Sequence, residues 1–169
     1  RGEYVRELAE KTKSISPDKL ARHLIDLILA EQKLDLAAIR VKFDRFFFES
    51  ELHKSGAVRK AIGQLKKKGL TYEKDGAIWF NSEKFGDDKD RVLIRENGEE
   101  TYFAADIAYH LHKLERKSDK LVNIWGTDHH GYINRIKAVV AALGYDPKEK
   151  LEIIIGQLVS LYRAGEPVK

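Results

Sequence analysis

The sequence predicts an α/β protein that combines a small antiparallel unit with a parallel β-sheet. Near the carboxyl end, two apolar runs, residues 121–125 (LVNIW) and 151–155 (LEIII), flank a stretch whose apolar residues have helical spacing. Strands of continuous apolar character on either side of a helix are typical of a parallel sheet that is covered on both faces. Earlier in the chain, an amphipathic helix precedes two hairpin signals, which predicts a separate α+β unit.

Length and composition indicate a globular protein and exclude several other classes. The 169 residues suffice for one domain, or for one domain with an appendage, and 43% of them are hydrophobic. There is no run of about 18 apolar residues, so we expect no membrane span. The absence of cysteine excludes disulfides and thiolate metal sites, and favours the reducing cytoplasm. The net charge of +4 is spread along the chain and is weak evidence for a nucleic-acid partner.

Both ends of the sequence predict that the chain is a piece of a longer protein. Arg1 is not an initiator residue, and a helical pattern begins almost at once, at Tyr4. The last five residues, GEPVK, predict a turn followed by a residue that has nothing to pack against.

The first third of the chain is predicted to be mostly helical. Ser16 before Pro17 predicts a helix start, because serine is a good cap and proline suits the first helical position. Leu20 and Leu24 then begin a helical repeat of apolar residues. The aromatic run 41–50 (VKFDRFFFES) predicts a strand whose phenylalanines face the core.

The middle of the chain predicts a helix and two hairpins. Residues 55–69 form an amphipathic pattern that ends at a glycine, and residues 70–80 (LTYEKDGAIWF) predict a hairpin around Asp75-Gly76. A second hairpin is predicted over residues 91–104, and the segment 86–90 (GDDKD) is expected to be a surface loop between the two hairpins.

The last third alternates between helix and strand. A helix is expected over residues 104–116, a strand over 121–125, a helix after residue 132 and a strand over 151–155. The segment 125–132 (WGTDHHGY) follows the first of these strands directly. Ligands of parallel α/β sheets bind beyond the carboxyl ends of the strands, so this position favours a functional loop over an ordinary turn.

Three interpretations compete for the segment 125–132. A metal site is disfavoured because the adjacent His129 and His130 diverge on regular backbone, and no other histidine has ligand spacing. The triplet with Asp128 resembles manganese phosphoesterases at those three letters, but their upstream aspartates are lacking. A nucleotide loop is favoured, because Gly126 admits a ligand to the backbone and an aspartate can accept bonds from ribose hydroxyls. In an ordinary turn, Asp128 would cap the next helix.

Several long motifs, in the same order, closely resemble bacterial arginyl-tRNA synthetases. They include the opening RGEYVRELA, FDRFFFESELHKSG at 43–56 and KGLTYEKDGAIWF at 68–80. The resemblance continues without interruption over residues 87–145 and ends with QLVSLYRAGEPVK at 157–169. It covers essentially the whole chain.

This resemblance implies part of a class I synthetase whose split Rossmann-like domain activates arginine with ATP and charges tRNA. Residues 1–40 would lead out of the missing first half of the domain, 41–100 would be the inserted helix-plus-hairpin unit, and 101–169 would be the second half. The histidine-bearing ATP signature would lie in the missing half. Lys169 matches only the first lysine of the Lys-Met-Ser-Lys-type signature and would be catalytic, so the chain alone is expected to be inactive. Mg²⁺ would accompany the ATP, and no protein-bound metal is expected.

Tyr102 and Asp106 are the candidates for binding the substrate side chain. They are four residues apart and therefore share one face of a helix. A carboxylate can hold a guanidinium through two parallel hydrogen bonds, which lysine cannot reproduce. From spacing alone, a capping acid and a core tyrosine are the favoured explanation of the pair. The resemblance assigns Tyr102, Asp106 and His129 to arginine.

The resemblance assigns a second group of residues to ATP. It consists of three residues of the segment 125–132 and one glutamine after the last strand: Gly126, Asp128, His130 and Gln157. Gln157 is the weaker candidate of the group, since a glutamine at a strand end is usually a hydrogen-bonded structural residue.

A nucleic-acid-binding module is the alternative from another functional class. The basic helix at 55–69 and the following hairpin imitate a winged helix, with Lys66, Lys67 and Lys68 available for phosphate. These lysines lie at the helix end, however, where they interact with the last carbonyl groups, and a reading helix would instead expose polar residues along one face. We therefore expect no DNA binding, and contact of this unit with tRNA remains open.

Overall fold

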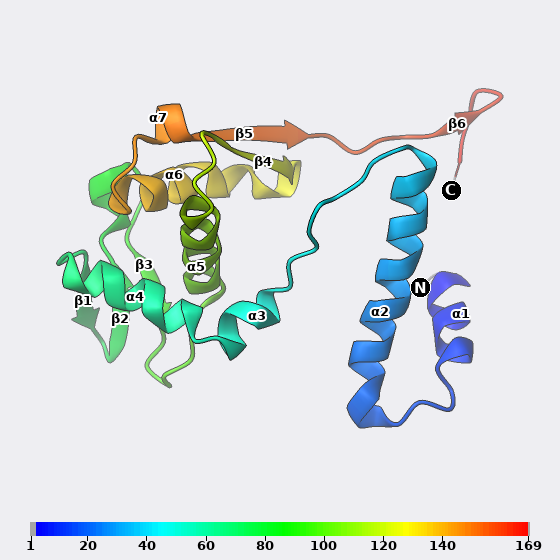
Figure 1. The fold of residues 1–169 in the computed structure, drawn as a ribbon, viewed down its shortest axis with the longest axis horizontal. Helices are drawn as coiled ribbons and strands as arrows, with labels where there is room; N and C mark the ends of the chain where they lie inside the picture. The colour runs from blue at the N-terminus through cyan, green and yellow to red at the C-terminus, as the bar shows by residue number, and fades with distance from the viewer. Residues whose placement is uncertain (1–2, 169) are drawn as a thin grey trace. The chain divides into compact units, whose positions relative to one another are not determined.

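The computed structural model describes residues 3–168 and divides the chain into two compact units (Figure 1). The first unit ends at Phe46, and its regular elements are the helices α1 (Glu3–Lys11) and α2 (Pro17–Ala38). The second unit begins at Phe47 and contains every strand of the described chain. None of the helices in residues 3–168 is long and apolar enough to cross a membrane.

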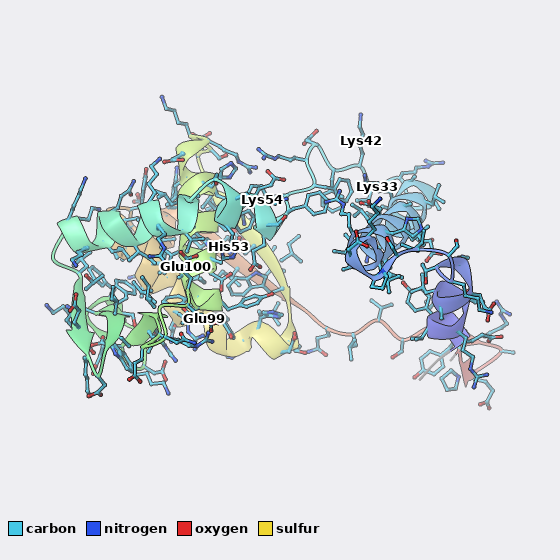
Figure 2. All side chains as sticks on the ribbon, turned by 90° about the horizontal axis from the view of Figure 1, so that it is seen from below. Lys33, Lys42, His53, Lys54, Glu99 and Glu100 are labelled. Atoms are coloured by element: carbon cyan, nitrogen blue, oxygen red, sulfur yellow. The ribbon has the colours of Figure 1, made fainter. Side chains whose placement is uncertain are left out.

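Helix α2 begins where the sequence predicts it. Ser16 has extended backbone angles (φ −65°, ψ 146°) and Pro17 is the first helical residue. No residue of α2 is buried, although its leucines follow a helical repeat. At its carboxyl end, the ammonium of Lys33 lies 4.6 Å from the ring centroid of Phe46, and Figure 2 labels Lys33 beside Lys42. The helical prediction for this part of the chain is therefore confirmed.

The strand predicted over residues 41–50 is wrong. Residues 41–48 have no strand partner, and α3 (Glu49–Lys54) begins directly after them. The side chain of Glu51 starts this helix by accepting a hydrogen bond from the Phe48 N–H at 3.3 Å. The phenylalanines do not share one core face, because Phe43 is 53% exposed while the ring of Phe47 packs 4.9 Å from that of Tyr109.

The next helix and the first hairpin agree with the prediction. Helix α4 (Ala57–Lys67) ends before Gly69, whose φ is +67°. Strands β1 (Thr71–Lys74) and β2 (Ala77–Phe80) are antiparallel. Both turn residues, Asp75 and Gly76, have positive φ (51° and 71°), which is the geometry of a two-residue hairpin turn.

The second predicted hairpin is not formed. A short 3-10 helix, η1 (Ser82–Phe85), leads to β3 (Arg91–Ile94), which pairs with β2 and gives the sheet order β1-β2-β3. After the turn at 97–98, the chain returns only as far as a single bridge between Ile94 and Glu100. The next residue, Thr101, already caps a helix by accepting a hydrogen bond from the Ala104 N–H at 3.3 Å, so no further strand can form.

The segment 86–90 was expected to be a surface loop, but part of it is buried. Asp87 is 6% exposed, and its carboxylate accepts hydrogen bonds from Arg91 Nε at 2.8 Å and Nη2 at 2.9 Å. Burial would raise the pKa of Asp87, but the hydrogen bonds from Arg91 and Asp88 outweigh it and hold this pKa well below its usual range. The ion pair fixes the loop to the start of β3.

The carboxyl-terminal part forms the predicted parallel sheet. Its elements are α5 (Tyr102–Glu115), β4 (Leu121–Gly126), the 3-10 helix η2 (Thr127–Tyr132), α6 (Ile133–Ala142), α7 (Pro147–Lys150) and β5 (Leu151–Gly156). Strands β4 and β5 are parallel, in a register that pairs Leu121 with Leu151 and Gly126 with Gly156. The short strands β6 (Tyr162–Arg163) and β7 (Glu166–Pro167) form a terminal hairpin.

Only one face of the parallel sheet is covered by the described residues. Leu121, Asn123 and Leu151 are buried against the helices, whereas Ile124 on the opposite face is 75% exposed and Ile154 is 45% exposed. The expectation of a sheet covered on both faces is therefore wrong for residues 3–168. The reason is topological, since the single crossover through α6 can cover only one side of the sheet.

One hydrophobic core joins the elements of the second unit. Its fully buried side chains come from α4, β2, β3, α5 and α6: Val58, Leu65, Phe80, Leu93, Ile107 and Ile136. Burial of each such side chain contributes about 1.5–3 kcal/mol, so α5 has a fixed place between the antiparallel unit and the parallel sheet. This helix carries the residues from which the site is built.

Candidate functional site

The predicted arginine-binding residues come together around one cavity, which we call the α5 cavity. It has a volume of about 230 Å³ and is bordered by α5, the end of β4, η2 and the start of α6. Its lining comprises Tyr102, Asp106, Tyr109, His110, Lys113, Asn123, Trp125, His129, Tyr132 and Ile136. All three residues that the sequence suggested for the amino acid, Tyr102, Asp106 and His129, are among them.

Helical spacing explains why α5 forms one wall of this cavity. The helix starts at Thr101, and the lining residues follow at intervals of three or four, which places them on one face. Tyr102 is 75% exposed at the mouth. On the opposite wall, the ring of His129 lies between those of Trp125 and Tyr132, with centroid separations of 6.1 Å and 5.9 Å.

Asp106 has the most perturbed carboxyl group of the site. Partial burial raises its pKa to about 6, and the charge of Glu49 adds to this effect, whereas Arg135 and His129 oppose it. An added positive charge close to Asp106 would stabilise the carboxylate. The environment of Asp106 therefore favours binding of a cationic ligand.

Asp106 also borders a second cavity, which we call the Glu49 cavity. It has a volume of about 220 Å³ and is lined by Phe47, Glu49, Leu52, Ala105, Asp106 and Tyr109. The sequence interpretation missed Glu49, because it placed this residue in a strand. A local pattern could have indicated Glu49. The Glu51 side chain accepts a hydrogen bond from the Phe48 N–H, which marks the start of a helix and makes Glu49 its first residue.

A chain of charged side chains connects Glu49 with the segment that precedes α5. His53 Nε2 lies 3.6 Å from Glu49 Oε1, and His53 Nδ1 lies 3.2 Å from Glu100 Oε2. Glu100 also accepts a hydrogen bond from Arg59 Nε at 2.8 Å, and its side chain is only 15% exposed. Figure 2 labels His53 and Glu100 next to each other beneath α4. These contacts fasten α3, and with it Glu49, beside α5.

A third cavity lies at the carboxyl ends of the parallel strands, and we call it the strand-end cavity. Its volume is about 320 Å³, and it is lined by Gly126, Thr127, Asp128, Gly156, Gln157 and Leu158. Three of the predicted ATP-binding residues, Gly126, Asp128 and Gln157, thus lie together. The Asp128 side chain is 78% exposed, and its Oδ1 lies 3.0 Å from His129 Nδ1.

Gly126 has a steric reason to be glycine. A Cβ at this position would lie 2.6 Å from Asp128 Oδ1, which is closer than real Cβ atoms approach a neighbour. A side chain at position 126 would therefore displace the Asp128 carboxylate from its present position. The geometry suits close approach of a ligand to the backbone.

One predicted site residue lies outside these cavities, and another falls outside the described residues. His130 is exposed and lines none of the three, although it belongs to η2. Lys169, the predicted catalytic lysine, lies outside the described residues. Residues 3–168 contain no group of three or more His, Asp or Glu side chains that could hold a metal ion.

Comparison with known proteins identifies the family. A family model described as "tRNA synthetases class I (R), catalytic domain" matches residues 2–158. The chain belongs to the arginyl-tRNA synthetase family. The chain is 57% identical over 137 residues to the arginine–tRNA ligase of Geobacillus thermodenitrificans, covering 81% of the chain and 24% of that relative. The corresponding enzyme of Moorella thermoacetica is 47% identical over 170 residues, covering 98% of the chain and 30% of the relative.

Solved structures agree with this membership of the synthetase family. A putative arginyl-tRNA synthetase from Campylobacter jejuni superposes with a TM-score of 0.87 at 42% identity, over 100% of this chain and 39% of that one. The arginyl-tRNA synthetase of Thermus thermophilus has a TM-score of 0.70 at 20% identity, over 83% of this chain and 31% of that one, and shows the fold alone. The chain thus spans less than half the length of these synthetases.

Lysines of the helix in the unit that imitated a winged helix contact other parts of the same protein. Lys66 Nζ lies 3.6 Å from Glu73 Oε1, and Lys68 Nζ donates a hydrogen bond to the Ala142 carbonyl at 3.1 Å. Two of the three lysines at this helix end therefore interact with the protein itself. The contact of Lys68 with the end of α6 connects the antiparallel unit to the helix that covers the parallel sheet.

Proposed function

We propose that the full-length protein containing this chain is an arginine–tRNA ligase, which activates L-arginine with ATP and transfers it to arginine tRNA. The observation that carries the proposal is the pair of carboxyl groups, Asp106 and Glu49, that border one cavity. Partial burial and, to a smaller extent, the charge of Glu49 raise the pKa of Asp106 to about 6. Family membership supports the reaction. Because the chain spans only 24% of the Geobacillus relative, it would supply only part of the catalytic machinery.

A guanidinium is the cation that this site fits best. It is a planar fork of N–H donors that carboxylates accept through parallel hydrogen bonds, whereas an ammonium is a compact point charge. Asp106 and Glu49 supply the acceptors. The stacked rings of Phe47 and Tyr109, inclined by 28°, supply flat walls against which a guanidinium can pack. Tyr102, which lines the adjoining α5 cavity, would add a contact to the guanidinium, and His129 would contact the remainder of the amino acid.

The strand-end cavity is the proposed site of the nucleotide. Gly126 admits the ligand to the backbone, Asp128 would accept hydrogen bonds from the ribose hydroxyls, and Gln157 would contact the same molecule. On the basis of the family motifs, His130 is a further proposed ATP contact and Lys169 is the proposed catalytic residue. Mg²⁺ would be held mainly by the ATP phosphates, because residues 3–168 offer no metal-binding group of side chains.

The proposed reaction has two steps. A carboxylate oxygen of arginine attacks the α-phosphorus of ATP, and the bond to the departing pyrophosphate breaks to give arginyl-adenylate. A ribose hydroxyl at the tRNA end then attacks the activated carbonyl, and AMP leaves with the electrons of the broken bond. Most tRNA contacts would come from other parts of the full-length protein, and the reaction would take place in the cytoplasm.

Arginine-dependent exchange of pyrophosphate into ATP by the full-length protein tests the proposal. We expect exchange with arginine and a loss of about two to three decades in kcat/KM for Asp106→Ala, because a buried charge-assisted contact is removed. Glu115→Gln is the matched control, since this acid lies on the same helix but its side chain is 51% exposed. Exchange that does not depend on arginine, or an equal loss in the control, would refute the proposal.

A further inference from the structure

A buried chain of polar side chains forms the floor of the α5 cavity. His110 and Asn123 are each 3% exposed, and Lys113 lies beside them. Asn123 Nδ2 lies 2.9 Å from His110 Nε2, and Lys113 Nζ donates a hydrogen bond to Asn123 Oδ1 at 2.6 Å. At the other end of the chain, His110 Nδ1 lies 2.8 Å from the backbone oxygen of Asp106.

The donor and acceptor of each hydrogen bond among these side chains follow from the two terminal groups, the Asp106 carbonyl and the Lys113 ammonium. The Asp106 carbonyl can only accept, so His110 Nδ1 carries the proton and donates it. Nε2 then has a free lone pair and accepts from the Asn123 amide, whose oxygen faces the ammonium of Lys113. Burial lowers the pKa of His110 to about 4, although its bond to Asp106 opposes the shift, so the ring is neutral at physiological pH.

Asn123 connects the two walls of the cavity. It belongs to β4, two residues before Trp125, and its amide bonds to side chains that both belong to α5. One wall carries Asp106, and the other leads directly to His129. Substrate geometry at a reacting centre must be held within about 0.5 Å, and a misplacement of about 1 Å can cost about a hundredfold in rate. The hydrogen bonds of Asn123 to His110 and Lys113 fix the distance between α5, which carries Asp106, and the end of β4, which leads to His129.

The floor also opposes a reversed orientation of the substrate. A guanidinium and an ammonium both offer only donors, so a guanidinium cannot pair with Lys113. The acceptors of the site, Asp106 and Glu49, lie toward the first turn of α5, and Lys113 lies two turns further along the helix. The site therefore has carboxylates near the first turn of α5 and an ammonium two turns further along the helix.

We propose that Asn123 and His110 are positioning residues for substrate recognition: they hold Asp106 in place relative to the strand end that carries His129. Lys113 completes the chain and directs the substrate guanidinium toward Asp106 and Glu49. This inference rests on the proposed function, because the guanidinium is that of the arginine substrate. None of the three side chains takes part in bond making or breaking.

A pair of variants of the full-length protein separates positioning from simple stabilisation. Asn123→Leu leaves His110 Nε2 and Lys113 without their partner, so we expect a lower melting temperature and an arginine KM raised about tenfold or more. In the double variant His110→Leu/Asn123→Leu both partners are apolar, and such replacements can be nearly neutral for stability. The double variant should recover much of the melting temperature, but its arginine KM should stay raised while its ATP KM stays within about twofold of wild type.

Two further variants complete the test. Lys113→Met keeps an apolar stem of similar length and removes the ammonium, which lies 4.7 Å from the ring centroid of Tyr109, so it should fold and still raise the arginine KM several-fold. Ser82→Ala is the matched control, because this buried hydroxyl donates to the Lys89 carbonyl at 2.8 Å and lines none of the three cavities, so its loss should affect stability alone. An unchanged arginine KM in Lys113→Met and the double variant would overturn the positioning role. A wild-type protein without arginine-dependent exchange would instead overturn the proposed function.

Discussion

The affinity for arginine should fall as the pH is lowered through about 6. Partial burial and the charge of Glu49 raise the pKa of Asp106 from 3.8 to about 6. Below this pH the carboxyl group is protonated and can no longer form a charged pair with a guanidinium, which stays protonated throughout. The affinity is therefore fully present above the raised pKa and is lost as the pH falls through it.

The size of the effect follows from the ionised fraction of Asp106. With a pKa of about 6, roughly nine tenths of the carboxyl groups are ionised at about pH 7 and roughly one tenth at about pH 5. Because apparent affinity scales with the competent fraction, the arginine KM should rise about tenfold between these values. Pyrophosphate exchange at saturating ATP measures this KM, and the ATP KM at saturating arginine is the internal control.

The groups that face Asp106 define the remaining controls. They are Glu49 from α3, Arg135 from α6 and His129 from η2. A His129→Gln variant separates any contribution of the imidazole, and an Asp106→Asn variant should lose the pH dependence of the arginine KM. The reasoning fails if the arginine KM of the wild type is flat down to about pH 5, or if the ATP KM changes in parallel.

Three further predictions concern stability and the nucleotide. Asp106→Asn should raise the free energy of unfolding at about pH 7 by about 1–2 kcal/mol, after a discount for partial exposure, because a carboxylate with a raised pKa destabilises the fold; urea titration without arginine measures this. Asp128→Ala should raise the ATP KM about tenfold or more. Gly126→Ala should also raise the ATP KM, because the added Cβ would meet the Asp128 carboxylate. A parallel rise in the arginine KM of either variant would contradict these two expectations. Arg91→Ala should cost about 3–5 kcal/mol of stability by leaving Asp87 buried without its partner, and a melting temperature within a degree or so of wild type would refute that role.

The parallel sheet and its functional edge could be predicted because the signals are local. Apolar runs of strand length on either side of a helical pattern lead to β4 and β5. The residues after such strands meet at one edge, so Asp128 and Gln157 come together as expected. Tyr102 and Asp106 share a helix face for an equally local reason, their spacing of four.

The features that the sequence did not predict depend on competition between distant partners. The aromatic run at 41–50 has strong strand propensity, yet it pairs with no strand of residues 3–168. Instead, the hydrogen bond from the Phe48 N–H to Glu51 begins a helix that places Glu49 beside Asp106. The second hairpin is reduced to a single bridge because Thr101, directly after Glu100, already caps α5. The bond between His110 and Asn123 joins different elements, and no spacing rule along the chain indicates it.

The discrimination between arginine and citrulline tests the central claim most directly. Citrulline has nearly the same shape but replaces one N–H₂ group of the guanidinium by a carbonyl oxygen, so it would point an acceptor at Asp106 and Glu49. A site built to pair buried polar groups rejects such an analogue by about four to five decades. In pyrophosphate exchange with the full-length protein, the account predicts a kcat/KM for arginine at least about three decades above that for citrulline. Values within about tenfold of each other would show that no carboxylate pair selects the substrate and would contradict the account.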